Sequence, residues 1–161
     1  MTRIGVTGHM NITADTATLV YDEIARILAA EGQRGDLVGI SCIARGADSV
    51  FAKAVLDAGG HLEVVLPCRN YREQKVKPDH LEQFDSLLTR ATTVHVLEFY
   101  AAGREAYEAA NEMLVGSSDR LIAVWGGEPS EKGGTGTVVD LARHKDIPVD
   151  IIWPTGARRG H

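Results

Sequence analysis

The sequence predicts an α/β domain with a Rossmann-like open parallel sheet that carries helices on both faces. Short apolar runs rich in β-branched residues alternate with longer segments of helical period. The apolar runs are continuous rather than alternating, which is typical of strands buried on both faces of a parallel sheet. The 161 residues, of which 44% are hydrophobic and 24% charged, suit one globular domain. We expect that domain to cover residues 1–154, with 155–161 as a flexible tail.

The first half of the chain shows the alternation of strand and helix patterns most clearly. Residues 3–7 predict a buried strand, and residues 14–30 predict a helix because their apolar positions recur on one face. Gly32 and Gly35 predict the end of that helix, since glycine readily takes the left-handed conformation found at helix C-termini. The next expected elements are a strand at 37–42, a helix at 47–58 and a strand at 61–66.

The second half repeats the pattern after a polar loop, which we expect over residues 67–78. The remaining expected elements are a helix at 79–90, a strand at 93–98, a helix at 105–115, a strand at 120–125, a helix at 134–145 and a strand at 148–153. Right-handed crossovers between such strands give an open sheet. Ligands of open α/β sheets bind outside the carboxyl ends of the strands, so the turns that follow the strands should carry the function.

Composition narrows the class of partner. The net charge is -5, which argues against nucleic acid, because neutralising phosphates with Lys and Arg supplies much of the affinity of nucleic-acid binders. Cys42 and Cys68 lack metal-ligand spacing, so we expect reduced thiols in a cytoplasmic protein, with neither a metal site nor a cofactor. No apolar run approaches the roughly 20 residues of a membrane helix, and no signal peptide is expected.

The turn after the first strand has the composition of a ligand-binding turn. Gly8 allows the backbone to come close to a ligand, and Thr7 and His9 offer side-chain donors. The segment is not a GxGxxG motif, so the dinucleotide fingerprint is absent. A tight turn with a purely structural role is the alternative.

The turn after the second strand leads into a helix N-terminus, where free N–H groups and the helix dipole favour an anion. We expect Ser41, Arg45, Gly46, Ala47 and Asp48 to contact the ligand, with Arg45 adding a fixed charge. Asp48 has an alternative role, because an acidic residue in the first turn of a helix is stabilised by the dipole. Pro67, directly after the third strand, is a further candidate.

The third glycine-rich turn enters the last helix. Its candidate ligand-binding residues are Gly133, Gly134, Thr135, Gly136 and Thr137, which form a phosphate cradle of glycines and hydroxyls at a helix start. Lys132 does not occupy the lysine position of a Walker motif, so a P-loop is not expected.

Two polar residues lie on predicted helices near these turns. Asp140 lies about one turn into the last helix and is the candidate catalytic residue, although many such Asp residues only interact with the dipole. Asn111 is a candidate for hydrogen bonding a base or ribose, and a solvated helix Asn is the alternative.

The three turns together resemble the SLOG superfamily of Rossmann-like domains, over nearly the whole chain. Residues 41–48, SCIARGAD, look like the SGxARGxD stretch of the DprA (Smf) DNA-processing domain. Residues 133–140, GGTGTVVD, look like the GGxGTxxE motif of the Lonely Guy (LOG) phosphoribohydrolases. The run 111–124 is similar to the helix and strand that lead into that motif.

The resemblance implies nucleotide-type ligands and a homodimer, but two departures bear on activity. LOG enzymes pair an Arg on the preceding helix with the motif Glu, and the Arg position falls here at Ala110 or Asn111. The Glu position is Asp140, which is one methylene shorter, and a catalytic carboxylate tolerates little displacement.

Three functions remain open on the sequence. The first is a SLOG-type sensor or carrier that binds a nucleotide or nucleotide derivative. The second is a LOG-like phosphoribohydrolase that cleaves the N-glycosidic bond of nucleoside monophosphates through Asp140. The third is a DprA-like module for single-stranded DNA, which the acidic composition disfavours.

Overall fold

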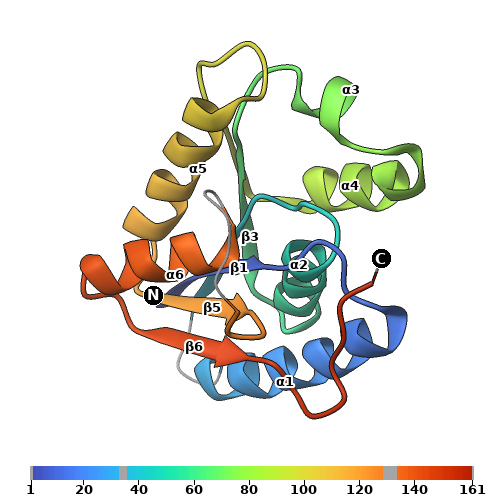
Figure 1. The fold of residues 1–161 in the computed structure, drawn as a ribbon, viewed down its shortest axis with the longest axis vertical. Helices are drawn as coiled ribbons and strands as arrows, with labels where there is room; N and C mark the ends of the chain where they lie inside the picture. The colour runs from blue at the N-terminus through green and yellow to red at the C-terminus, as the bar shows by residue number, and fades with distance from the viewer. Residues whose placement is uncertain (1, 33–35, 129–133, 161) are drawn as a thin grey trace.

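The fold is a six-stranded, all-parallel sheet with the strand order β4-β3-β2-β1-β5-β6 (Figure 1). The computed structural model describes residues 2–32, 36–128 and 134–160. The strands are β1 (Thr2–Gly8), β2 (Leu37–Ser41), β3 (His61–Leu66), β4 (Thr93–Val96), β5 (Arg120–Val124) and β6 (Val149–Ile152). The predicted Rossmann-like α/β class is therefore confirmed.

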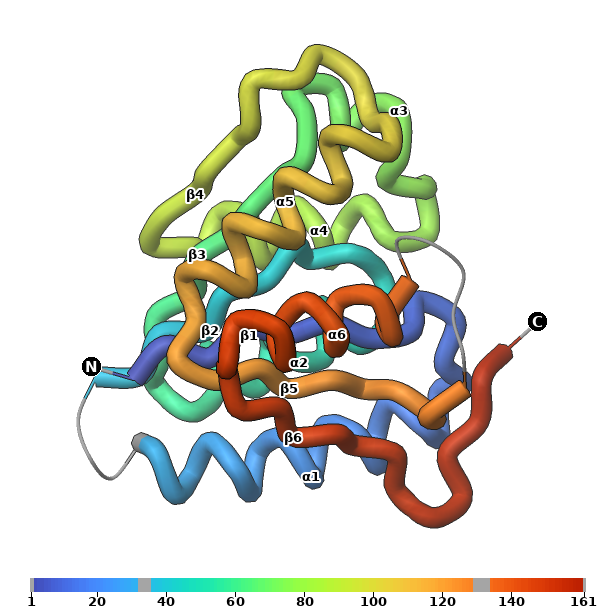
Figure 2. Tube along the Cα trace, turned by 60° about the vertical axis from the view of Figure 1, so that its left-hand side comes forward, coloured from blue at the N-terminus to red at the C-terminus, as the bar shows by residue number. Residues whose placement is uncertain are grey.

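Helices cover both faces of the sheet, as the continuous apolar strands predicted. The helices are α1 (Ala14–Gly32), α2 (Ala47–Asp57), α3 (Tyr71–Lys75), α4 (Pro78–Arg90), α5 (Arg104–Gly116) and α6 (Thr135–His144). Figures 1 and 2 show α5 and α6 on one side of the sheet and α1 and α2 on the other. The helix α4 packs beside α2, where Phe84 and Leu87 join Ala52 in one buried cluster.

The strand order creates a switch point between β1 and β5. The chain moves outward from β1 through β2 and β3 to the edge strand β4, and then returns to place β5 against the other side of β1. The central strand β1 thus pairs through Ile4 with Gly39 on one side and with Arg120 on the other. In open α/β sheets, the crevice at such a reversal, outside the carboxyl ends of the strands, is the usual ligand site.

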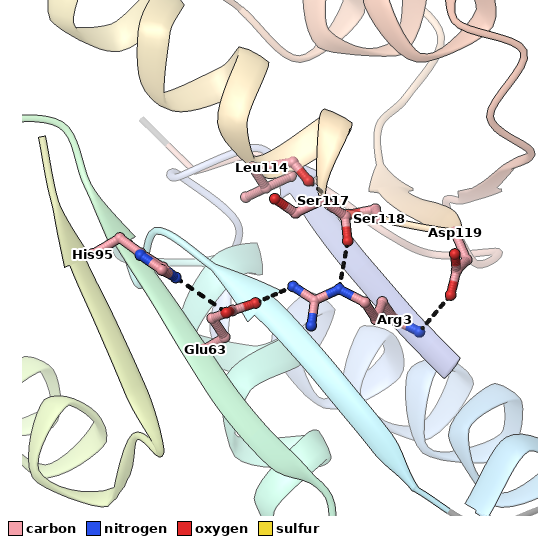
Figure 3. A network of polar contacts seen from close by, with 7 residues as sticks. All are labelled: Arg3, Glu63, His95, Leu114, Ser117, Ser118 and Asp119. Atoms are coloured by element: carbon pink, nitrogen blue, oxygen red, sulfur yellow. Dashed lines mark hydrogen bonds and ion pairs between the residues drawn. The ribbon is translucent and has the colours of Figure 1, made fainter. Parts of the chain in front are cut away.

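A row of polar side chains crosses the sheet beneath the end of α5 (Figure 3). The Arg3 guanidinium forms an ion pair with Glu63, and its Nε donates a hydrogen bond of 2.7 Å to the Ser117 carbonyl. Glu63 also accepts from His95, at 3.1 Å between Nε2 and Oε1. Although burial opposes ionisation, the contacts with His95 and Arg3 leave the pKa of Glu63 below its ordinary value. This network joins β1, β3, β4 and α5 at the end of the sheet away from the switch point.

The short helix α3 lies where the sequence predicted a loop over 67–78, so that part of the prediction is wrong. Five residues are too few to show a helical period. Packing of Tyr71, which is 7% exposed, stabilises the helix instead. Its ring lies 6.2 Å from that of Phe84 on α4, between centroids.

The C-terminal segment, expected to be a flexible tail, contacts the turn after β1 in the part that the structure describes. The Arg158 N–H donates to Thr16 Oγ1 at 2.7 Å, and its carbonyl accepts from the Thr13 N–H at 3.2 Å. Asn11 Nδ2 donates to the Gly160 carbonyl at 3.0 Å. Within residues 2–32, 36–128 and 134–160, no helix is long and apolar enough to cross a membrane.

Candidate functional site

A cavity of about 550 Å³ opens at the carboxyl ends of β1, β2 and β3 and extends beneath α5. Its inner wall is formed by β1, the turns after β1, β2 and β3, and the start of α2: Val6, Thr7, Gly8, Met10, Cys42, Ala44, Asp48 and Pro67. Its outer wall is formed by α3 and α5 through Tyr71, Lys75, Arg104, Tyr107, Glu108, Ala110, Asn111 and Leu114. Five residues predicted from the sequence therefore meet here: Thr7, Gly8, Asp48, Pro67 and Asn111.

The end of β1 lies so close to its neighbours that residue 8 has no room for a side chain. A Cβ at Gly8 would lie 2.5 Å from the Ala47 Cβ and 2.8 Å from the Val124 Cβ. Glycine therefore lets β1, α2 and β5 converge at the switch point. Ala47, which is fully buried, fills this junction rather than lining the cavity.

The turn from β2 into α2 is held by its own serines. The Ser41 hydroxyl accepts from the Ile43 N–H at 3.0 Å and donates to the Asp48 carbonyl at 3.0 Å. Ser49 Oγ donates to the Ala44 carbonyl at 2.6 Å. Ser41 is fully buried, so its predicted ligand contact is replaced in this structure by a contact within the turn.

The same turn has two residues with positive φ. Ile43 has φ 46° and is fully buried, and the His80 Nε2 on α4 donates to its carbonyl at 3.1 Å. Gly46 has φ 80°, and a Cβ there would lie 2.5 Å from the Met10 carbonyl oxygen. A left-handed conformation costs energy for Ile, so the surrounding contacts must fix it.

Asp48 is partly exposed at the cavity wall but densely surrounded by protein. Burial raises the pKa of its carboxyl to about 7, while a hydrogen bond from the Ala44 backbone opposes that rise. Burial raises the pKa of Cys42 and of Tyr71, and the Asp48 charge raises both further. The three groups therefore lie in one neighbourhood.

Arg45, the predicted phosphate ligand, points away from this cavity. Its guanidinium pairs with Asp79 at the start of α4, and it borders smaller hollows on the far side of the turn. Of the described residues, the cations that line the main cavity are Lys75 and Arg104, neither of which was predicted from the sequence. Arg104 Nε donates to Glu108 Oε1 at 3.0 Å, and both side chains are largely exposed.

The missed α5 residues had a signal in the sequence. The missed residues Arg104, Tyr107 and Glu108 recur with the predicted Asn111 at the spacing of one helix face. A helix that follows a strand in this fold begins near the carboxyl edge of the sheet, so this face was a candidate wall.

His9 contributes to the junction of the strands rather than to the cavity lining. Its ring meets that of Trp153 edge-on, with 5.4 Å between centroids. Its Nε2 accepts from the Gly126 N–H at 3.3 Å, and its carbonyl accepts from the Ala47 N–H at 3.1 Å. Burial, followed by the charge of Arg159, lowers the pKa of His9.

The predicted phosphate cradle is described only in part, because Gly133 lies outside the described residues. Gly134 caps α6 and accepts from the Thr137 N–H at 3.0 Å, while Thr135 and Gly136 are buried. Asp140 is exposed on α6. Of the described residues that line the main cavity, none belongs to α6. No group of His, Cys, Asp and Glu that could hold a metal occurs among the residues described.

This geometry defines the class: a Rossmann-like domain with a cavity at the carboxyl ends of its parallel strands. No protein-family model and no curated protein matches the sequence, whereas solved structures match its fold.

The DNA processing protein A (DprA) of Streptococcus pneumoniae is 20% identical with a TM-score of 0.67, over 96% of this chain and 51% of that one. The chain therefore spans about half the length of that relative. The Helicobacter pylori DprA, described as binding single-stranded DNA, is 16% identical with a TM-score of 0.71, over 99% and 68%.

A molybdenum cofactor binding protein from Rippkaea orientalis is 22% identical, with a TM-score of 0.59 over 93% of this chain and 75% of that one. These neighbours share the Rossmann-like fold that the resemblance of the three turns implied. At these identities, what is shared is the fold.

Proposed function

We propose that the chain is a SLOG-type sensor or carrier that binds a nucleotide or nucleotide derivative in the cavity beneath α5. The observation that carries the proposal is the cavity itself, about 550 Å³ at the carboxyl ends of β1, β2 and β3. Small-molecule sites have volumes of about 300–1,000 Å³ and combine apolar walls with a few placed polar groups. Val6, Pro67 and Leu114 are such apolar walls, and Thr7 and Asn111 are such polar groups.

The charged residues suggest how the ligand is oriented. Arg104 and Lys75 supply positive charge on the outer wall, where a phosphate would remain partly solvated. The start of α6 is a second phosphate site in this proposal, because its motif resembles that of LOG proteins.

The structural neighbours support a small ligand and leave a nucleic acid as the alternative. One is described as a molybdenum cofactor binding protein, and another as binding single-stranded DNA. The net charge of -5 and a cavity of single-ligand size favour the small molecule, because a strand of DNA needs an extended basic groove.

One observation favours the phosphoribohydrolase alternative and another opposes it. Arg104 brings a cation to the cavity from α5, the helix on which LOG enzymes carry their Arg, although it lies earlier on the helix than the expected position. The candidate catalytic Asp140 is exposed on α6. A binding protein therefore remains the proposal.

Two further features belong to the same proposal. A homodimer follows from the SLOG resemblance, and sedimentation equilibrium tests it. A cytoplasmic location agrees with Cys42 and Cys68, which are both free thiols in the structure.

The test is to measure the binding of AMP and of GMP to the whole chain by thermal shift and by calorimetry. A ligand at about 100 times its dissociation constant adds about 2.7 kcal/mol of stability. Arg104→Ala should weaken nucleotide binding by about 1 kcal/mol, a discounted value because the side chain is exposed. Nucleosides without phosphate should be hardly affected.

Arg45→Ala is the matched comparison, because Arg45 is a half-buried arginine that also pairs with a carboxylate but lies outside the cavity. We expect it to leave the dissociation constant unchanged. A larger loss for Arg45→Ala than for Arg104→Ala would instead assign the phosphate to the turn after β2. If no nucleotide shifts the melting temperature, the proposed function is wrong.

A further inference from the structure

Two carboxyl groups line the cavity, and they differ in how the protein satisfies them. Glu108 is on the outer wall, where its side chain is 60% exposed and paired with Arg104. Asp48 is on the inner wall, beside Cys42. No Lys, Arg or His of the described residues lies within ion-pair distance of it, as the ion pairs of this region involve other carboxylates.

The described part of the chain leaves most of the hydrogen-bonding capacity of Asp48 unused. An ionised carboxylate has about four acceptor positions. The Ala44 backbone N–H donates a hydrogen bond to one of these positions. The neighbouring hydroxyls of Ser41 and Ser49 donate to backbone carbonyls instead. This half-buried carboxylate at the cavity wall therefore offers acceptor positions to a ligand that brings N–H donors.

A purely helical role for Asp48 does not account for this arrangement. The dipole of α2 would stabilise the ionised form and lower the pKa of a first-turn carboxyl. The pKa of Asp48 is instead raised to about 7. Burial is the largest cause of that rise.

We propose that Asp48 is the specificity residue of the site and accepts two N–H groups from the 2-amino-4-oxopyrimidine edge that guanine and pterins share. This inference rests on the proposed function and names the ligand class. A carboxylate has two parallel acceptor oxygens and no donor. The guanine or pterin edge offers two adjacent N–H donors to match them. Adenine and cytosine each place an acceptor nitrogen beside their amino group, and that nitrogen would face the carboxylate lone pairs.

The walls around Asp48 suit a flat ring. Pro67, Ala110 and Leu114 provide apolar surface around the same space, and Tyr71 borders it. Aromatic and apolar walls favour heteroaromatic rings, and a single polar edge then fixes the orientation.

The ionisation state of the Asp48 carboxyl makes ligand affinity depend on pH. A ligand that needs the carboxylate binds more tightly as pH rises through about 7. A ligand that needs the protonated acid, as adenine would, binds more tightly as pH falls. The other titratable or charged groups around the cavity are Cys42, Tyr71, Lys75, Arg104, Tyr107 and Glu108, and His80 lies behind the turn. Asp48→Asn separates the effect of Asp48 from theirs.

The experiment is calorimetry on the whole chain at pH 6 and pH 8, with GMP, IMP and AMP as probes. IMP keeps the ring N–H of GMP but lacks its 2-amino group. We expect GMP to bind about tenfold more tightly than IMP, as for a lost hydrogen bond to a charged group. We expect GMP binding to tighten by about tenfold from pH 6 to pH 8, because the ionised fraction rises in that ratio around a pKa of about 7.

In Asp48→Asn, both the preference for GMP over IMP and the pH dependence should disappear. The comparison of GMP with IMP in the wild type keeps the proposal testable if the variant does not fold. A parallel titration with 6-hydroxymethylpterin distinguishes guanine from pterins as the source of this edge. If the pterin binds more tightly than GMP, the ligand is a pterin; if it binds more weakly, the ligand carries guanine.

Equal affinities for GMP, IMP and AMP would overturn the role of Asp48 while the proposed nucleotide site stands. Tighter binding of AMP at pH 6 than at pH 8 would overturn it in favour of an adenine ligand read by the acid. Absence of binding by every nucleotide and by the pterin would overturn the proposed function as well.

Discussion

At the scale of single residues, Asp48 should lower the stability of the unliganded protein at neutral and alkaline pH. The folded protein holds the pKa of this carboxyl at about 7, against an ordinary value of 3.8. The folded state therefore binds more protons than the unfolded state between these values, and its stability falls as pH rises through that window.

We expect Asp48→Asn to raise the free energy of unfolding at pH 8, on the order of 1–4 kcal/mol, and to have little effect near pH 4. Urea unfolding at a series of pH values measures both. Asp36→Asn serves as the control because Asp36 is exposed at the start of β2. A variant less stable than the wild type at pH 8 would show that the carboxylate is satisfied in the unliganded protein.

At the scale of elements, the turn between β2 and α2 depends on α4 for its shape. His80 Nε2 donates to the Ile43 carbonyl and also lies 3.4 Å from Ser49 Oγ. Ile43 keeps its positive φ in a fully buried position, and Cys42, Ala44 and Asp48 reach the cavity from the same turn. The helix α4 thus positions one wall of a site that it does not line.

His80→Leu should remove the closer of two partners of the Ile43 carbonyl, which Ser49 Oγ also approaches at 3.4 Å. We expect a loss of about 0.5–1.5 kcal/mol in stability, the net contribution of one hydrogen bond. Nucleotide affinity should fall too, although His80 does not line the cavity. Chemical denaturation and calorimetry measure the two effects. His61→Leu is the control, since His61 is exposed at the start of β3, and an equal effect of both variants would contradict the role given to His80.

At the scale of the whole molecule, the arrangement of charged groups predicts a binder rather than a hydrolase. The cavity has its cations on α3 and α5, whereas the candidate catalytic Asp140 is exposed on α6. Misplacement of one catalytic group commonly costs a hundredfold or more in rate, about 2.7 kcal/mol. We therefore expect no release of free base from AMP or GMP, as followed by chromatography. Turnover that is lost in Asp140→Asn would instead establish a phosphoribohydrolase.

Sequence patterns predicted the architecture well because burial sets them. Continuous apolar runs identified the parallel strands, and the rule that ligands bind at the carboxyl ends of the strands selected Thr7, Asp48 and Pro67. The direction of Arg45 could not be predicted in this way. It depends on Asp79, which is distant in sequence and becomes a neighbour only when α4 packs beside α2.

The central position of β1 also sets when the site can form. Thr7 and Gly8 of β1 line the same cavity as Ala110 and Leu114 of α5, so the cavity needs the first strand and α5 together. Contacts between segments so far apart in sequence form slowly, because bringing them together costs the entropy of closing a long loop. A ligand in this cavity can therefore stabilise only a chain that has already been synthesised through α5. It acts on the last stage of folding and not on the β1–β4 half that emerges earlier.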